Sequence, residues 1–109
     1  MQIDNQGLSV SELREKTLDA EYTDDLEQML SYASEWAKLD CCSVDAHDYK
    51  GVALCEMAKD HTNGKEAITL TSKARDCFQK ALDLSSSQNR SESDQRKLKI
   101  WIRKCVKLR

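Results

Sequence analysis

Five cysteines and two histidines are the side chains of this sequence with the most reactive chemistry. Cys41 and Cys42 are adjacent, and His47 follows them closely. Thiolates and imidazoles are common zinc ligands, so this segment is the best candidate for a metal-binding or thiol-dependent site. Adjacent cysteines lack the spacing of about two to four intervening residues that lets two thiolates point at one ion. We therefore expect no metal or other cofactor, and keep this segment as the alternative to a binding function.

The remaining cysteines, Cys55, Cys77 and Cys105, fall on the apolar stripes of predicted helices. A thiol in that position behaves as a small hydrophobic side chain rather than as a nucleophile. The sequence contains neither a glycine-rich phosphate loop nor a Gly-x-Ser-x-Gly turn. The many carboxylates lie on predicted solvated faces and in first helical turns, where the helix dipole accounts for them. We expect no catalytic residues and predict that the protein is not an enzyme.

The C-terminal segment is the strongest candidate for a binding surface, because it is both basic and amphipathic. Its apolar residues share one face of a helix. The candidate partner-binding residues on the other arc are Lys97, Lys99, Ile100, Arg103, Lys104 and Lys107. Such a helix could bind an acidic protein or peptide, a membrane surface or nucleic acid, or could be a cap with a solvated outer face. Nucleic acid is the least favoured partner, because no aromatic residue is interleaved with the basic ones.

Charge is distributed unevenly along the chain, although the formal net charge is only −2. Residues 1–61 carry 14 acidic and 5 basic side chains, whereas residues 62–109 carry 5 acidic and 12 basic ones. Either the two parts attract each other within one folded domain, or the basic end meets an acidic partner.

Composition favours helices and a reducing compartment. The 109 residues suit one domain, and the absence of proline with only three glycines leaves too few turn residues for a sheet protein. An odd number of cysteines without a signal peptide predicts a cytoplasmic or nuclear location. No apolar run approaches the roughly 20 residues of a membrane span. We predict an all-α fold, an antiparallel array of about five helices.

Capping signals divide residues 1–109 into these helices. After a flexible N-terminus of about residues 1–8, Ser9 and Glu12 have capping-box spacing for a helix ending near residue 20. Thr23 can cap a second helix to about residue 39, and Ser43 a third over 44–60. Asn63 can cap a fourth over about 65–84, after a turn in which Gly64 adopts a left-handed conformation. A polar linker, 85–93, precedes the last helix at about 94–108.

The segment from Ala74 through Phe78 and Ala81 resembles the second helix of a tetratricopeptide repeat, in which a small residue, an aromatic and an alanine recur at these spacings. The resemblance implies a fragment of an α-solenoid in which the last helix acts as a cap. It also implies a scaffold or adaptor that binds another protein or peptide, or that associates with itself or a second subunit through an uncapped end. Phe78 is then expected in the core.

Overall fold

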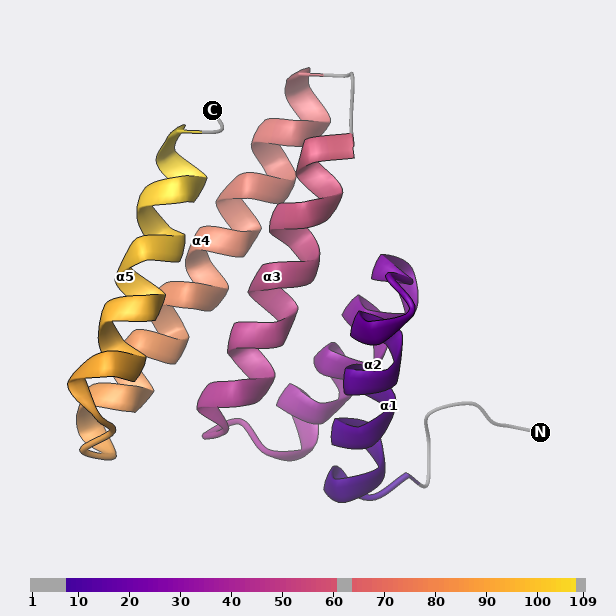
Figure 1. Ribbon diagram of the computed structural model, residues 1–109, viewed down its shortest axis with the longest axis vertical. Helices are drawn as coiled ribbons and strands as arrows, with labels where there is room; N and C mark the ends of the chain where they lie inside the picture. The colour runs from indigo at the N-terminus through magenta and orange to yellow at the C-terminus, as the bar shows by residue number, and fades with distance from the viewer. Residues whose placement is uncertain (1–7, 61–63, 108–109) are drawn as a thin grey trace.

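The computed structural model describes residues 8–60 and 64–107, and within these ranges the chain forms five helices and no strand. The all-α fold class and the antiparallel order of the helices are confirmed (Figure 1). The predicted cap at Asn63 lies outside the described residues, and so does most of the predicted flexible N-terminus. The helices are α1 (Val10–Tyr22), α2 (Leu26–Leu39), α3 (Val44–Asp60), α4 (Gly64–Ser87) and α5 (Glu92–Lys107).

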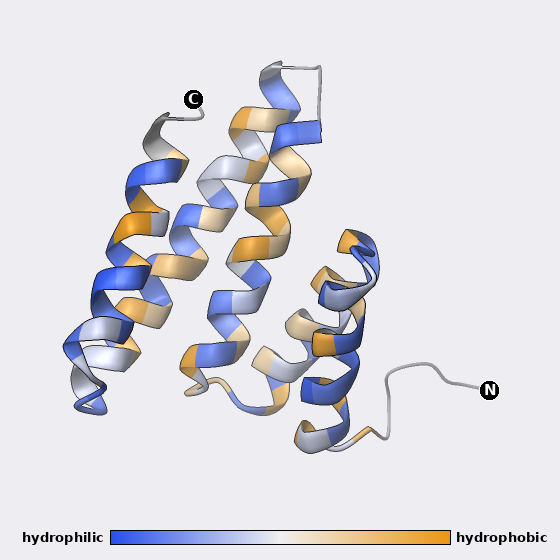
Figure 2. Ribbon diagram, in the orientation of Figure 1, coloured by the Kyte–Doolittle hydropathy of each residue, from blue (hydrophilic) through white to orange (hydrophobic). Residues whose placement is uncertain are grey.

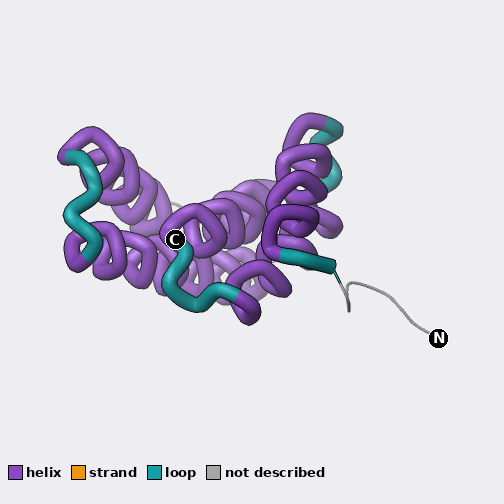
Figure 3. The backbone as a smooth tube through the Cα atoms, turned by 90° about the horizontal axis from the view of Figure 1, so that it is seen from below, coloured by secondary structure: helices purple, strands orange, loops and turns teal. Residues whose placement is uncertain are grey.

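Each helix packs mainly against its neighbours in the sequence, so α1 and α5 lie at opposite ends of the array (Figure 1). Seen from below, the helices follow a curve rather than a plane (Figure 3). The array measures 41 × 37 × 21 Å. α3 contacts both α2 and α4, as expected from the many small residues around its circumference.

Local capping explains where most helices begin. The Ser9 hydroxyl accepts a bond from the Glu12 amide at 3.1 Å, and the Glu12 carboxylate accepts one from the Ser9 amide at 3.0 Å, so the predicted capping box is confirmed. Ser43 caps α3 as predicted. The predicted cap at Thr23 is wrong. Thr23 ends α1, and the Asp25 carboxylate caps α2, because the left-handed Asp24 (φ 60°) turns the chain between them.

The predicted linker over residues 85–93 is too long. α4 continues through Ser87 and α5 begins at Glu92. After Ser87 the helix is terminated by Asn89, whose φ of 56° lets the Arg90 amide donate to the Ser85 carbonyl at 2.9 Å. The run of serines suggested a loop, but Ser85 continues the buried stripe of Ala74, Phe78 and Ala81. Gly64, expected in a left-handed turn, is instead the first residue of α4.

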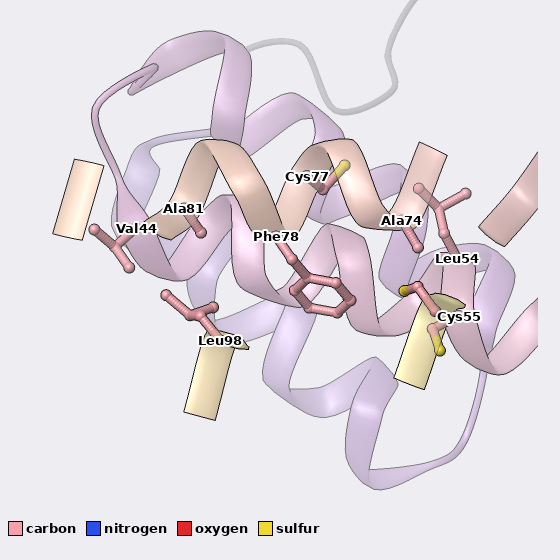
Figure 4. Close-up of a cluster of buried hydrophobic side chains, with 9 residues drawn as sticks. Val44, Leu54, Cys55, Ala74, Cys77, Phe78, Ala81 and Leu98 are labelled. Carbon is pink, nitrogen blue, oxygen red and sulfur yellow. The ribbon is translucent and has the colours of Figure 1, made fainter. Parts of the chain in front are cut away.

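Phe78 lies at the centre of the main core cluster, which joins α3, α4 and α5 (Figure 4). Its side chain is fully buried, as predicted. A Cβ atom on Gly51 would lie 2.8 Å from the Phe78 ring, so glycine allows the ring to rest against the backbone of α3. Trp101 stacks on the ring from α5, with centroids 5.3 Å apart. The ring therefore connects three helices.

Smaller clusters join α1, α2 and α3. Leu13, Trp36 and Ala46 form one, and Ala20, Met29 and Ala53 form the other. The apolar residues of these helices alternate with polar ones along each ribbon (Figure 2). Of the two terminal helices, α5 is the more basic.

Candidate protein-binding surfaces

The outer side of α5 carries an exposed apolar side chain surrounded by cations. Ile100 keeps 45% of its surface exposed. Arg96 and Arg103 are also exposed and share its side of the helix, since they lie four and three residues from it. The exposed Lys99 lies three and four residues from Arg96 and Arg103, so it adjoins both of them. We call these four residues the α5 outer face. Arg96 was not among the predicted binding residues, although its spacing from Ile100 could have identified it.

Lys97 differs from its neighbours because it reaches back to the array. Its ammonium lies 3.7 Å from the Asp48 carboxylate on α3. Arg90, before α5, likewise lies 3.5 Å from Asp45 and 3.2 Å from Asp94. Part of the basic charge near the C-terminal end is therefore paired with carboxylates within the domain. Burial raises the pKa of Asp48, and the nearby Lys97 works against that shift.

Lys104 is also engaged within the domain. Its ammonium lies 4.7 Å from the centre of the Trp101 ring, a cation–π contact. The same Trp101 ring stacks on Phe78. Lys107 belongs to the last turn of α5, and its side chain lies outside the described part of the structure. Of the predicted binding residues, Lys99, Ile100 and Arg103 are thus the ones that the structure brings together at the surface.

A second candidate surface is a hollow of about 420 Å³ between α2, α3 and α4. Its apolar lining comes from Leu30, Leu54 and Cys77, and Lys50 and Lys73 stand among its polar residues. The hollow also includes Asp76, so its charge is mixed. Three helices contribute to it, which is why no single stretch of sequence indicated it.

The Cys41–Cys42–His47 segment does not form a three-ligand site. The His47 Nε2 atom lies 3.1 Å from the backbone carbonyl of Cys41, so the imidazole is engaged with main chain. Among the described residues, no group of three or more potential metal ligands comes together. The two sulfur atoms nevertheless lie only 4.0 Å apart. Both residues are central in a turn closed by a hydrogen bond from the Ser43 amide to the Asp40 carbonyl, and this turn places their sulfur atoms close together.

Comparison with known proteins does not indicate which of these surfaces is functional. No protein-family model matches the chain, and no curated protein or solved structure shows significant similarity to it. The resemblance to tetratricopeptide repeats therefore depends on Ala74, Phe78 and Ala81, each of which is fully buried. None of the described helices combines the length and apolar character needed to cross a membrane.

Proposed function

We propose that this protein is a non-enzymatic interaction module, a scaffold or adaptor of tetratricopeptide-like helices, that binds an acidic segment of another cytoplasmic or nuclear protein on the α5 outer face. The observation that carries the proposal is the exposed Ile100 with three exposed cations around it. Cations direct the approach of an acidic partner, and a central apolar side chain supplies contact once water is excluded.

An acidic protein segment suits this face better than nucleic acid or a lipid surface. Nucleic acids without base-specific contacts bind to exposed aromatic rings as well as to cations. Trp101 is half-buried, stacks on Phe78 and is covered by Lys104. A helix that lies in a membrane interface needs a broad apolar face, whereas Ile100 is the one exposed large hydrophobic residue that α5 has among the described side chains.

A charge-reversal experiment tests the proposal. Lys99→Glu with Arg103→Glu changes the α5 outer face, and Arg14→Glu with Lys16→Glu makes the same change in charge on exposed residues of α1. Each protein would be used to capture partners from cells of the native host, with identification by mass spectrometry. We expect the α1 variant and the wild type to retain the same partners, in a salt-sensitive manner, and the α5 variant to lose them.

Retention of the same partners by the α5 variant at low salt would contradict the proposal. The hollow between α2, α3 and α4 would then be the surface to test, by Lys50→Glu with Lys73→Glu. Ile100→Ala provides a test that does not involve charge. We expect it to weaken binding by about 1–2 kcal/mol, as for a contact residue at the centre of an interface. Because the side chain is exposed, the free energy of unfolding should change by less than about 0.5 kcal/mol.

A further inference from the structure

The turn between α2 and α3 presents two thiols to solvent side by side. Cys41 and Cys42 are both exposed, and their Sγ atoms are 4.0 Å apart. The other three cysteines are buried in the helical core. The turn is therefore the place where an aqueous reagent meets two thiols at once.

Contacts from outside the turn hold the backbone of both cysteines. The Cys41 carbonyl lies 3.1 Å from the His47 ring, and the Cys42 carbonyl accepts a hydrogen bond of 2.7 Å from the Gln88 side chain. Gln88 belongs to the turn between α4 and α5, 46 residues away in the sequence. Both contacts restrain the backbone of the turn, and the contact from Gln88 comes from a distant part of the chain.

We propose that Cys41 and Cys42 form a reversible oxidation site, at which a hydroperoxide converts the adjacent thiols into a disulfide. One thiolate attacks an oxygen of hydrogen peroxide, the O–O bond breaks, and a sulfenic acid and hydroxide result. The hydroxide takes up the proton that the thiol released on ionisation and becomes water. The second thiol attacks that sulfur, the S–O bond breaks, and a second water leaves as the S–S bond forms. Two thiols and one hydrogen peroxide thus give one disulfide and two waters, with the peroxide reduced by two electrons.

Geometry makes this disulfide a labile one. Adjacent Cα atoms across a trans peptide are about 3.8 Å apart, which is shorter than the usual range of about 4.4–6.8 Å for disulfides. The sulfurs must also approach from 4.0 Å to the roughly 2.05 Å of an S–S bond. The resulting small ring is strained, and strained, exposed disulfides are the readily reduced ones. Thiols should therefore restore the reduced turn easily.

Ring closure should also affect the neighbouring turn. It forces new dihedral angles on the peptide between the two cysteines, and this peptide carries the carbonyl next to the one that Gln88 contacts. The oxidised turn should hold Gln88 less well, and the turn between α4 and α5 should exchange its amide hydrogens faster. Oxidation of the two cysteines would then loosen the turn that leads into α5.

The pH dependence of the reaction follows from the contact between the two sulfur atoms. A hydrogen bond to Cys41 is the main cause that raises the pKa of the Cys42 thiol. Burial raises the pKa of Cys105 to about 12. Since the thiolate is the nucleophile, the oxidation rate at the turn should rise with pH above neutrality, while Cys105 stays protonated and unreactive.

The test treats the full chain with one equivalent of hydrogen peroxide and identifies the products by tryptic mass spectrometry. We expect the peptide that holds both Cys41 and Cys42 to lose about 2 Da, the mass of two hydrogens, and to regain it with dithiothreitol. The peptides that hold Cys55 and Cys77 are internal controls, and should keep alkylatable thiols. Cys41→Ser should give no such loss and should instead yield a sulfenic acid that dimedone traps.

Phenylarsine oxide, which bridges two neighbouring thiols, provides a second measurement that needs no oxidation. The wild type should bind one equivalent at least about 100-fold more tightly than Cys41→Ser or Cys42→Ser, the gain expected from two linked contacts. Main products consisting of disulfide-linked dimers, or of sulfinic acids without the intramolecular disulfide, would overturn the proposal. Equal affinity of wild type and single variants for the arsenical would overturn it too.

Discussion

The two ends of the helical array are held by different kinds of core. α3, α4 and α5 meet around one large ring, Phe78, which rests on Gly51 and is covered by Trp101. α1, α2 and α3 meet in two smaller clusters around Leu13 and Met29. The first arrangement surrounds one large ring with eight other buried residues in a single cluster, whereas the second divides its buried side chains between two clusters.

α3 is shared by both ends of the array, and it contributes different small residues to each core. α3 presents Gly51 and Cys55 to the large ring, and Ala46 and Ala53 to α1 and α2. Small residues on both sides let α2 and α4 approach it closely. Because one core surrounds a single large ring and the other is divided between two clusters, substitutions should affect the two ends unequally.

The largest effect is expected from Phe78→Ala. Removing a fully buried aromatic ring should lower the free energy of unfolding by about 3–5 kcal/mol, and the loss should be accompanied by exposure of Trp101. Urea unfolding followed by tryptophan fluorescence measures both. A transition midpoint that barely moves would remove Phe78 from the core and with it the main support for the repeat resemblance.

Leu13→Ala tests the core that is divided between two clusters. Leu13 is fully buried, so its truncation should cost about 2–5 kcal/mol, and we expect less than for Phe78 because neighbouring clusters remain intact. Hydrogen exchange should quicken in α1 and α2 and change little in α4 and α5. Equal loss of protection throughout would mean that the two cores are not separable.

Gly51→Ala should sharpen the comparison, because the sign of its effect on the free energy of unfolding depends on whether Phe78 is present. In the wild type, the added methyl would meet the ring at 2.8 Å, and the overpacking should outweigh the helical preference for alanine by about 1–2 kcal/mol. In the Phe78→Ala background the clash is gone, so the same change should stabilise by up to about 1 kcal/mol. A double-mutant cycle measures this reversal, and additive effects would contradict the close contact.

Ser85→Ala should stabilise the end of α4. The Ser85 side chain is fully buried, and its Oγ atom has no hydrogen-bond partner among the described residues. Replacing an unsatisfied hydroxyl with a methyl in a helix should raise the free energy of unfolding by about 1 kcal/mol. Thermal unfolding monitored by circular dichroism provides the measurement, with the exposed Ser86→Ala as the control. An unchanged or lower Tm would show that the hydroxyl is satisfied.

Asp48→Asn is expected to have the smallest effect on the free energy of unfolding. The effect should be visible in how that free energy depends on pH. Burial raises the pKa of Asp48 above its ordinary value of 3.8. The folded protein then holds this proton at a pH where the unfolded chain has lost it, so the contribution to stability falls as pH rises through that interval. Asparagine removes this fall, and the loss of the Lys97 ion pair costs at most about 1 kcal/mol. Denaturation curves from pH 4 to 7 should therefore diverge, and parallel curves would contradict the assignment.

The sequence by itself determined the features that arise from neighbouring residues. The capping box at Ser9, the cap at Ser43 and the burial of Phe78 all follow from spacings within one or two helical turns. Such spacings are readable because the side chain and the backbone group that it contacts lie only a few residues apart. The all-α class follows from the composition, because a chain with no proline and three glycines has too few turn residues for a sheet protein.

Tertiary structure alone decided which of these side chains are available for function. Lys97 is paired with Asp48, and Lys104 covers Trp101, so the basic face is narrower than its sequence indicates. Ser85 is fully buried, although its neighbours resemble a linker. The sulfurs of Cys41 and Cys42 converge in a turn that Gln88 holds from a distant part of the chain. Each outcome depends on residues far apart in sequence, whose proximity is set by how the helices pack and not by any local pattern.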